Sequence, residues 1–596
     1  MKEEKESDKK NALLIALKSL GLHLSIAQKR KMLMMVVLIF FSAVLDVFGL
    51  ASILPIVKLA GNPASLHDIG ALEWLYVNLG FTDDKKFLLL VIMLVLAFFI
   101  FKSLFGYFVN YLQSRFVGDI AYTITQHQFS KYFHLDFHQF TSLKSSVVTH
   151  HIINNPLSYV LWIVLPLIML LTEGIIVLLI VGGMAYYDFK LFLFITVIIG
   201  PATWLIFALL KNRSSYIGRE MNRIFPLSLG TINQTINGYI DIKLAEKEDH
   251  YKRRFLRLQG SYQRLNMAAY LQNLIPMRAN ELIALLGVVF IFIYSIFLTD
   301  NHEQAVVMIS LFAAAAYRLM PSMNRIVASL VYIRKNTTTM ENLSLYNEEF
   351  KHRKAKSVQE ELSFDKEIIF DHLSFTFPGK TEPVLKDIKM SIRKGEKIGI
   401  VGSSGSGKTT LMNLLLRFYI ETQGSIKVDG KNLGPQHLSD WRKKIGYVKQ
   451  DIFLLDGTIK DNIAFGEDGI DDQRLALAVK QASLEKLIQS LPQGLDTNIG
   501  EKGSKLSGGQ RQRISIARSL YRNAEILIFD EATSALDNET EIEVTESIDS
   551  LSESNKTIFI IAHRITTLRN CDRIYDLREG EVVGIYTYAE LVEKVV

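Results

Sequence analysis

The amino-acid sequence predicts an α-helical transmembrane domain fused to an α/β domain. Three observations predict this fold class. Long apolar runs crowd the part of the 596-residue chain before Arg334 and then stop. From Leu362 onward, short β-branched segments alternate with helical ones, which is the layout of an α/β domain. Hydrophobic residues make up 49% of the chain although 21% are charged, as expected when a membrane half is joined to a soluble half.

The charge and cysteine content narrow the possible classes. The formal net charge of +6 is small for this length, and positive loops beside membrane spans explain it, so we expect no nucleic-acid partner. Cys571 is the only cysteine of the chain, which makes an intramolecular disulfide impossible. A lone thiol in a soluble cytoplasmic domain is most simply a packing residue.

Residues 1–31 are expected to form an N-terminal extension. Its first ten residues are charged, but no apolar core with a small-residue cleavage site follows, so they do not read as a signal peptide. Residues 11–31 place leucines at helical spacing among lysines. Two interpretations stay open: an amphipathic helix on the inner membrane surface, or a helix packed against the rest of the domain.

Six segments within 32–335 are long and apolar enough to cross a bilayer, which takes roughly 20 residues each. Lys29, Arg30 and Lys31 precede the first span and place the N-terminus in the cytoplasm. An even number of spans then returns the C-terminal half to the cytoplasm. The expected spans are 32–59, 87–109, 157–186, 189–210, 274–298 and 305–326.

The loops between these spans are uneven. The cytoplasmic segments 110–156 and 211–273 are long, polar and helix-like, so we expect the span helices to continue far below the membrane. Short helices are expected near 137–145 and 238–244, where apolar residues lie among polar ones. The outer loop 61–86 repeats leucines at helical spacing and predicts either an amphipathic helix on the outer surface or a buried cap over the spans.

Five of the ionisable residues inside the expected spans or at their ends are candidates for a functional role. Such a side chain costs roughly 2.5–3.5 kcal/mol on insertion scales, so it usually faces a cavity or a partner. Arg318 and Arg325 are two helical turns apart and share one face. They are either a cationic strip that binds an anionic substrate, or arginines that snorkel or pair with Glu281. The five residues are Asp46, Glu173, Glu281, Arg318 and Arg325.

A phosphate-binding motif follows the polar segment 336–361, which reads as a linker. Residues 398–416 are an apolar strand, a glycine-rich turn and a helix, and the turn fits the pattern G-x-x-x-x-G-K-[ST]. Glycines let backbone N–H groups close around phosphate oxygens, and the helix points its positive end at them. Lys408 can reach the outer phosphates, and the Thr409 hydroxyl can ligate Mg²⁺. The expected cradle comprises Gly402, Ser403, Ser404, Gly405, Ser406, Gly407, Lys408, Thr409 and Thr410.

Further motifs in 362–596 fit phosphoryl transfer, which is mainly positioning and charge stabilisation. Asp530 ends a buried strand where it can hold Mg²⁺, and Glu531 is placed to polarise an attacking water. His563 ends another buried strand and can contact the γ-phosphate. Gln450 can touch Mg²⁺ and sense the nucleotide.

Two more motifs complete the expected nucleotide site. The segment 506–510 opens a helix, so that Ser507, Gly508, Gly509 and Gln510 can present hydrogen bonds to the γ-phosphate. Phe377 offers an aromatic ring upstream of the glycine loop.

Together, these motifs make residues 362–596 resemble the nucleotide-binding domain of ATP-binding cassette (ABC) transporters. Residues 506–510 match the signature sequence of that family, 534–537 its D-loop and 500–503 its exporter-specific X-loop, and Phe377 stands where the adenine-stacking residue is usually tyrosine. Six spans followed by one cassette resemble an exporter half-transporter. The resemblance implies ATP and Mg²⁺ as cofactors and a dimer in which each ATP lies between one chain's glycine loop and the other chain's signature. Because Glu531 and the signature are intact, it favours a homodimer.

The segment 316–326 narrows the resemblance to bacterial lipid-linked oligosaccharide flippases. That group implies a polyprenyl-pyrophosphate glycan as substrate, for which arginines in the cavity make physical sense. It also implies the cytoplasmic membrane of a bacterium, with the cassette in the cytoplasm. An exporter of lipids, peptides or drugs driven by the same ATPase stays open as an alternative. The predicted spans argue against a cassette ATPase of DNA repair or translation.

Overall fold

A computed structural model describes residues 12–52, 70–187, 189–298, 302–347, 360–531, 538–552, 555–562 and 564–595. The chain divides into two compact units. The first contains the chain up to Leu135 and Gln139–Phe350, and the second contains Asp136–His138 and Lys351–Val596.

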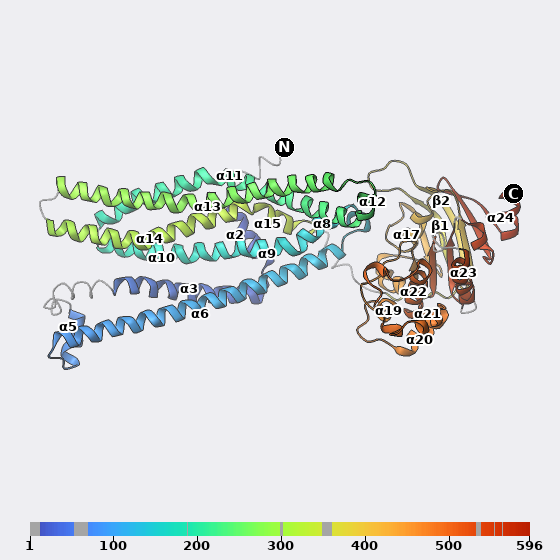
Figure 1. The fold of residues 1–596 in the computed structure, drawn as a ribbon, viewed down its shortest axis with the longest axis horizontal. Coiled ribbons are helices and arrows are strands. Elements are labelled where there is room, and N and C mark those ends of the chain that lie inside the picture. The colour runs from blue at the N-terminus through green and yellow to red at the C-terminus, as the bar shows by residue number, and fades with distance from the viewer. Residues whose placement is uncertain are drawn as a thin grey trace. The chain divides into compact units, whose positions relative to one another are not determined.

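Long helices make up most of the first unit and lie side by side in Figure 1. Helices α11, α13 and α14 pack against one another, α3 packs along α6, and α10 contacts α3, α11 and α14. The bounds are α3 Ile26–Ala51, α6 Asp84–Phe133, α10 Leu165–Tyr187, α11 Phe189–Asn237, α13 Glu248–Leu298 and α14 His302–Lys335.

Five of the six expected spans each fall on one of these helices as far as they are described, and the third, 157–186, lies in α10 and the helical residues directly before it. Three helical stretches among the described residues are long and apolar enough to cross a membrane: Ile26–Gly49, Asp84–Phe133 and Ser145–Tyr186. The spans expected at 189–210, 274–298 and 305–326 lie in α11, α13 and α14. The end of the first span, 53–59, lies outside the described residues, and the count of six stays a prediction.

The helices extend well beyond the expected spans. Helix α6 continues to Phe133, α11 continues to Asn237, and α13 begins at Glu248, which confirms the helical continuation predicted for both long loops. Two short helices lie where they were expected, α7 (Phe137–Ser142) and α12 (Tyr239–Leu244). The ring of Phe137 stacks on Phe418 inside the second unit, with ring centroids 4.7 Å apart.

The third membrane segment contains two π-helical turns. Helices α8 (Ser145–Thr149), α9 (Asn155–Tyr159) and α10 are joined by π turns at His150–Asn154 and Val160–Val164, on either side of Pro156. A proline removes a backbone donor from the helical ladder, and π-helical backbone, which is rare, occurs mostly as single turns inside α-helices.

The N-terminal helix α2 (Ala12–His23) packs on the first unit. Its residues Ala16 and Leu20 are buried in a hydrophobic cluster with Ile124 of α6 and Tyr159 of α9. The packed-helix interpretation therefore describes one face of α2. The other face leaves large apolar side chains exposed, which suits contact with a lipid surface: Leu14, Leu17 and Leu22.

Part of the segment expected to be a linker is helical and packed. Helix α15 (Thr337–Ser344) buries Met340 and Leu343 in the same cluster as α2. Its polar composition suggested a linker because only these few apolar residues face the core. In the loop expected outside the membrane, the short helix α5 (Gly70–Asn78) packs Tyr76 edge-on against Phe87 and leaves Trp74 exposed. Its contact with an outer membrane surface stays a prediction.

The second unit contains two sheets. One is antiparallel with the order β2-β1-β4-β5, and the other has the order β10-β9-β3-β8-β7-β6. In the second sheet β9, β3, β8, β7 and β6 run parallel and β10 runs antiparallel at the edge. The bounds are β1 Glu367–Phe375, β2 Leu385–Arg393, β3 Lys397–Val401, β4 Gln423–Val428, β5 Lys431–Asn432, β6 Ile445–Val448, β7 Ile526–Asp530, β8 Thr557–Ile561, β9 Arg573–Arg578 and β10 Glu581–Tyr586.

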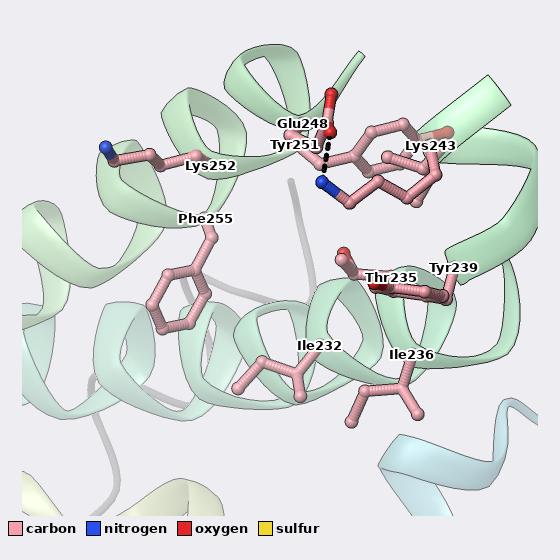
Figure 2. A pocket seen from close by; sticks show the side chains of 10 residues that line it. Ile232, Thr235, Ile236, Tyr239, Lys243, Glu248, Tyr251, Lys252 and Phe255 are labelled. Atoms are coloured by element: carbon pink, nitrogen blue, oxygen red, sulfur yellow. Dashed lines mark hydrogen bonds and ion pairs between the residues drawn. The ribbon is translucent and has the colours of Figure 1, made fainter. Parts of the chain in front are cut away.

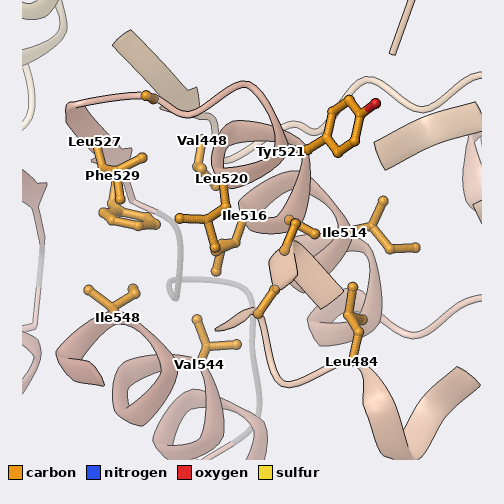
Figure 3. Packing of buried hydrophobic residues seen from close by; sticks show 14 of the residues in the cluster. Val448, Leu484, Ile514, Ile516, Leu520, Tyr521, Leu527, Phe529, Val544 and Ile548 are labelled. Atoms are coloured by element: carbon orange, nitrogen blue, oxygen red, sulfur yellow. The ribbon is translucent and has the colours of Figure 1, made fainter. Parts of the chain in front are cut away.

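Helices cover the six-stranded sheet and bury its apolar strands on both faces, as parallel sheets require. Helix α22 (Gly508–Tyr521) and helix α23 (Asn538–Ser552) enclose one cluster with β6 and β7, in which Ile516, Phe529 and Val544 are fully buried (Figure 3). The α/β class predicted for 362–596 is therefore confirmed.

Candidate functional site

The glycine-rich turn connects β3 to helix α17 (Lys408–Leu415), as the motif predicts. Gly405 and Gly407 adopt φ angles of +85° and +105°, which side chains rarely tolerate. At Gly402 an added Cβ would lie 2.1 Å from the Leu577 carbonyl oxygen, so glycine is required there. The turn is thus a cradle of closely approaching backbone, suited to phosphate oxygens.

Two polar groups inside the cradle fit an anionic ligand. The Lys408 ammonium donates to the carbonyls of Gly402 at 2.8 Å and Ser403 at 2.9 Å, and the side chain is buried. Burial lowers the pKa of Lys408, while the charges of Glu531 and Asp530 oppose that shift. The buried Ser406 hydroxyl oxygen has no hydrogen-bond partner among the described residues. A bound phosphate would supply acceptors to both groups.

Lys408→Ala is expected to weaken nucleotide binding roughly 10–100-fold, because hydrogen bonds to a charged group contribute about 1.5–3 kcal/mol. Equilibrium titration with a fluorescent ATP analogue measures this loss. The exposed Lys486 of the same unit provides the control Lys486→Ala, which should bind as wild type. If wild type and Lys408→Ala bound the ATP analogue with equal affinity, Lys408 would not belong to the nucleotide site.

The carboxylates lie at the carboxyl ends of the parallel strands, next to the cradle. Strand β7 ends at Asp530, and β8, its neighbour, separates it from β3. Glu531 follows with φ +51° and donates its backbone N–H to the Ile561 carbonyl at 3.0 Å. The left-handed conformation costs roughly 1–2 kcal/mol for such a residue and is frequently kept for function. Burial raises the pKa of Asp530.

Tyr447 belongs to this site although sequence reasoning missed it. Its phenol donates to the Asp530 carboxylate at 2.7 Å from the adjacent strand β6. Side chains alternate between the two faces along each strand, which limits the residues that Tyr447 can contact. The contact with Asp530 can be predicted only when the register of β6 and β7 is known. Gln450, two residues after β6, lies exposed at the same sheet edge.

The signature segment forms a helix N-terminus. The Ser507 hydroxyl accepts from the backbone N–H of Gln510, whose side chain accepts from the Ser507 N–H, so a capping box begins α22. The donors of Gly508 and Gly509 thus lie in its first turn. His563 and the D-loop 534–537 lie outside the described residues, and their roles stay predictions.

Phe377 is half-buried and is held by two rings. Phe375 and Tyr419 approach it edge-on, with ring centroids 5.0 and 5.4 Å away. Such T-shaped contacts fix an aromatic plane. The arrangement fits a platform for a flat base.

Four of the five ionisable candidates in the expected spans pair with opposite charges from other helices. Arg318 of α14 contacts Asp46 of α3 at 3.0 Å, and Lys102 of α6 contacts the other oxygen of Asp46 at 2.7 Å. Arg325 contacts the buried Glu173 of α10 at 2.5 Å. Sequence reasoning missed Lys102, since a lysine late in an apolar run reads as a boundary residue.

The pairing of the arginines with Glu281, one interpretation of the sequence, is wrong. Glu281 contacts Arg278, three residues earlier on its own helix, at 3.0 Å. The i,i+3 spacing brings these two side chains together more simply than a contact across helices. The contacts around the two arginines contain three cations and two carboxylates, so the cluster carries one excess positive charge. Its members are Lys102, Arg318, Arg325, Asp46 and Glu173.

Comparisons with known proteins agree with this geometry. Residues 385–534 match the family model described as ABC transporter. The chain is 32% identical over 436 residues to an ATP-dependent lipid A-core flippase of Cupriavidus metallidurans, covering 72% of each chain. It is 46% identical over 227 residues to a putative multidrug export ATP-binding/permease protein of Staphylococcus aureus, and that match spans 38% of this chain and 39% of the relative. A bacterial Atm1-family ABC exporter, solved with ATP bound, has a similar fold with a TM-score of 0.77 and 23% identity, covering 96% of this chain and 97% of that one.

Proposed function

Because this chain belongs to the ABC exporter half-transporters, we propose a function within that family. We propose that it is an ATP-driven flippase of polyprenyl-pyrophosphate-linked oligosaccharide. Two copies would form a homodimer in the cytoplasmic membrane of a bacterium, with the cassettes in the cytoplasm. The alternative is an exporter of other lipids, peptides or drugs with the same ATPase. The relatives' names, a lipid A-core flippase and a multidrug exporter, are compatible with both.

The observation that carries the substrate class is the cluster of cations in the first unit. Lys102, Arg318 and Arg325 come from two helices and outnumber the acids they contact by one. A charged group among apolar helices usually serves a pathway or a ligand. A pyrophosphate could replace Asp46 and Glu173 as partner, because guanidinium groups match phosphate with two parallel donors.

We propose a separate role in ATP hydrolysis for each candidate residue of the nucleotide-binding domain. Bound MgATP supplies the phosphoryl group, and its metal neutralises developing charge. Lys408 and the donors of the glycine loop would hold the phosphates, while Thr409, Gln450 and Asp530 would hold the metal. Glu531 would accept a proton from the attacking water. Phe377 would stack on the adenine.

The test of this function is transport into proteoliposomes. A polyprenyl-pyrophosphate glycan should be flipped with ATP and should stimulate ATP hydrolysis, while a phospholipid, a peptide and a cationic drug should not. Stimulation by the drug or peptide alone would favour the alternative.

The proposed homodimer can be tested separately, through the contact expected between residues 238–244 of one copy and 450–455 of the other. Helix α12, with the adjoining parts of α11 and α13, surrounds an apolar pocket of about 310 Å³ that includes Tyr239 and Phe255 (Figure 2). Ile240 on α12 is 70% exposed, and Phe453, three residues after Gln450, is 64% exposed. Family architecture implies that 238–244 of one copy meets 450–455 of the other.

The pair Ile240→Cys and Phe453→Cys should therefore crosslink between chains and yield a covalent dimer on a denaturing gel. Ile240→Cys with Val583→Cys, another exposed position, is the control and should stay monomeric. Burial raises the pKa of Cys571 to about 12, so the native thiol stays protonated near pH 8 and contributes little background. Crosslinks formed only within single chains would contradict the swapped arrangement.

A further inference from the structure

Tyr447 and Asp530 form a hydrogen bond between neighbouring strands that none of the sequence motifs includes. In the parallel pair of β6 and β7, Tyr447 lies opposite Ile528. Alternate residues of a strand point to the same face, so Asp530 is the next residue on the Ile528 side of β7. The phenol Oη reaches Asp530 Oδ2 at 2.7 Å, the usual length of a good O–H···O bond.

The surroundings of Tyr447 hold the phenol in place. Its half-buried ring packs against the hydrophobic cluster beneath the sheet, and the Lys449 ammonium lies 5.4 Å from the ring centroid. Asp530 is also half-buried. A partly desolvated carboxylate requires hydrogen-bond donors, and a donor from a rigid strand fixes its orientation.

We propose that Tyr447 is a positioning residue for the metal-binding carboxylate of the ATPase site. Its phenol engages Oδ2 of Asp530, so that Oδ1 would be the oxygen that holds Mg²⁺, directly or through a water. The bond holds one rotamer before the metal arrives, so less side-chain freedom is lost on binding. This inference rests on the proposed role of Asp530.

The test is Tyr447→Phe in the full-length protein, which removes one hydroxyl and keeps the ring. Groups that orient a metal ligand typically contribute 10–100-fold to metal affinity. With a saturating non-hydrolysable ATP analogue, Mn²⁺ binding followed by electron paramagnetic resonance should weaken about 10-fold. Binding of the same analogue in EDTA should not change, because the phenol contacts the carboxylate and not the glycine loop.

A matched control is Tyr575→Phe. Tyr575 is a buried tyrosine of the same sheet, and its hydroxyl donates to the Ser391 carbonyl at 3.2 Å. The same chemical change there should leave Mn²⁺ affinity as in wild type. Equal weakening in both variants would mean a general loss of packing and would overturn the proposal. Should Tyr447→Phe fail to fold, Tyr447→Leu, which also lacks the hydroxyl, takes its place and is expected to show the same 10-fold loss; wild-type Mn²⁺ affinity there overturns the proposal.

Asp530→Asn separates this inference from the function on which it rests. If Tyr447 acts through Asp530, then Tyr447→Phe should have no further effect on Mn²⁺ affinity in the Asp530→Asn background. Wild-type Mn²⁺ affinity in Asp530→Asn would overturn the metal-binding role of Asp530 itself. A defective Asp530→Asn beside a wild-type-like Tyr447→Phe would overturn only the role of Tyr447.

Discussion

Glu531→Gln is expected to lower the rate of ATP hydrolysis by roughly 10²–10⁴-fold, the usual contribution of a general base. The change removes the carboxylate charge but keeps side-chain length and the donor to the Ile561 carbonyl. Lys408 and the glycine loop are untouched, so binding of MgATP should persist. ATP should then accumulate between two cassettes of a closed dimer.

Phosphate release and retention of radiolabelled ATP on a desalting column measure the two parts of this prediction. The hydrolysis rate should fall while ATP stays bound to the protein through the column. Glu485→Gln, at an exposed helix position of the same unit, is the matched control and should hydrolyse ATP normally. Near-normal ATP hydrolysis in Glu531→Gln would mean that another residue is the general base.

Arg318→Ala combined with Arg325→Ala is expected to abolish flipping of a polyprenyl-pyrophosphate glycan while basal ATP hydrolysis continues. The charge balance of the cluster explains the size of the effect. With both arginines removed, Lys102 remains against Asp46 and Glu173, and the site changes from one excess positive to one excess negative charge. A negative site repels a pyrophosphate that must leave water to enter it.

The variant requires a control for stability, because Glu173 is buried and loses its partner. An uncompensated buried charge costs about 3–5 kcal/mol. Adding Glu173→Gln removes the orphaned charge, while Asp46 keeps Lys102 as its partner, and should restore stability in a thermal melt without restoring transport. Arg278→Ala, which breaks an exposed ion pair on α13, should flip at the wild-type rate.

Lysine substitutions refine this prediction. Lysine at 318 and 325 keeps the charge but loses the bidentate geometry, so flipping should recover only in part. A wild-type flipping rate in the double alanine variant would return both arginines to the role of structural ion-pair partners.

The local motifs were predictable because their chemistry lies within a few consecutive residues. The cradle of 402–409 depends on glycines at Gly402, Gly405 and Gly407 and on one following helix, and the structure has that turn and that helix. The α/β layout and the long helices follow from strand-length and span-length apolar runs, which local periodicity reports directly. Ser507 likewise caps its helix as its neighbours predict.

Contacts between distant residues were decided by packing. Tyr447 and Asp530 are 83 positions apart, and Arg318 and Asp46 are 272 apart, so only strand register and helix packing bring them together. The same holds for α15, whose polar sequence hides two side chains that complete a core made by α2, α6 and α9. The sequence by itself thus determined the class of the protein and the chemistry of its nucleotide loop, because a motif of adjacent residues carries its own geometry. The tertiary structure decided which carboxylate each cation and phenol meets, because that choice depends on the alignment of separate elements.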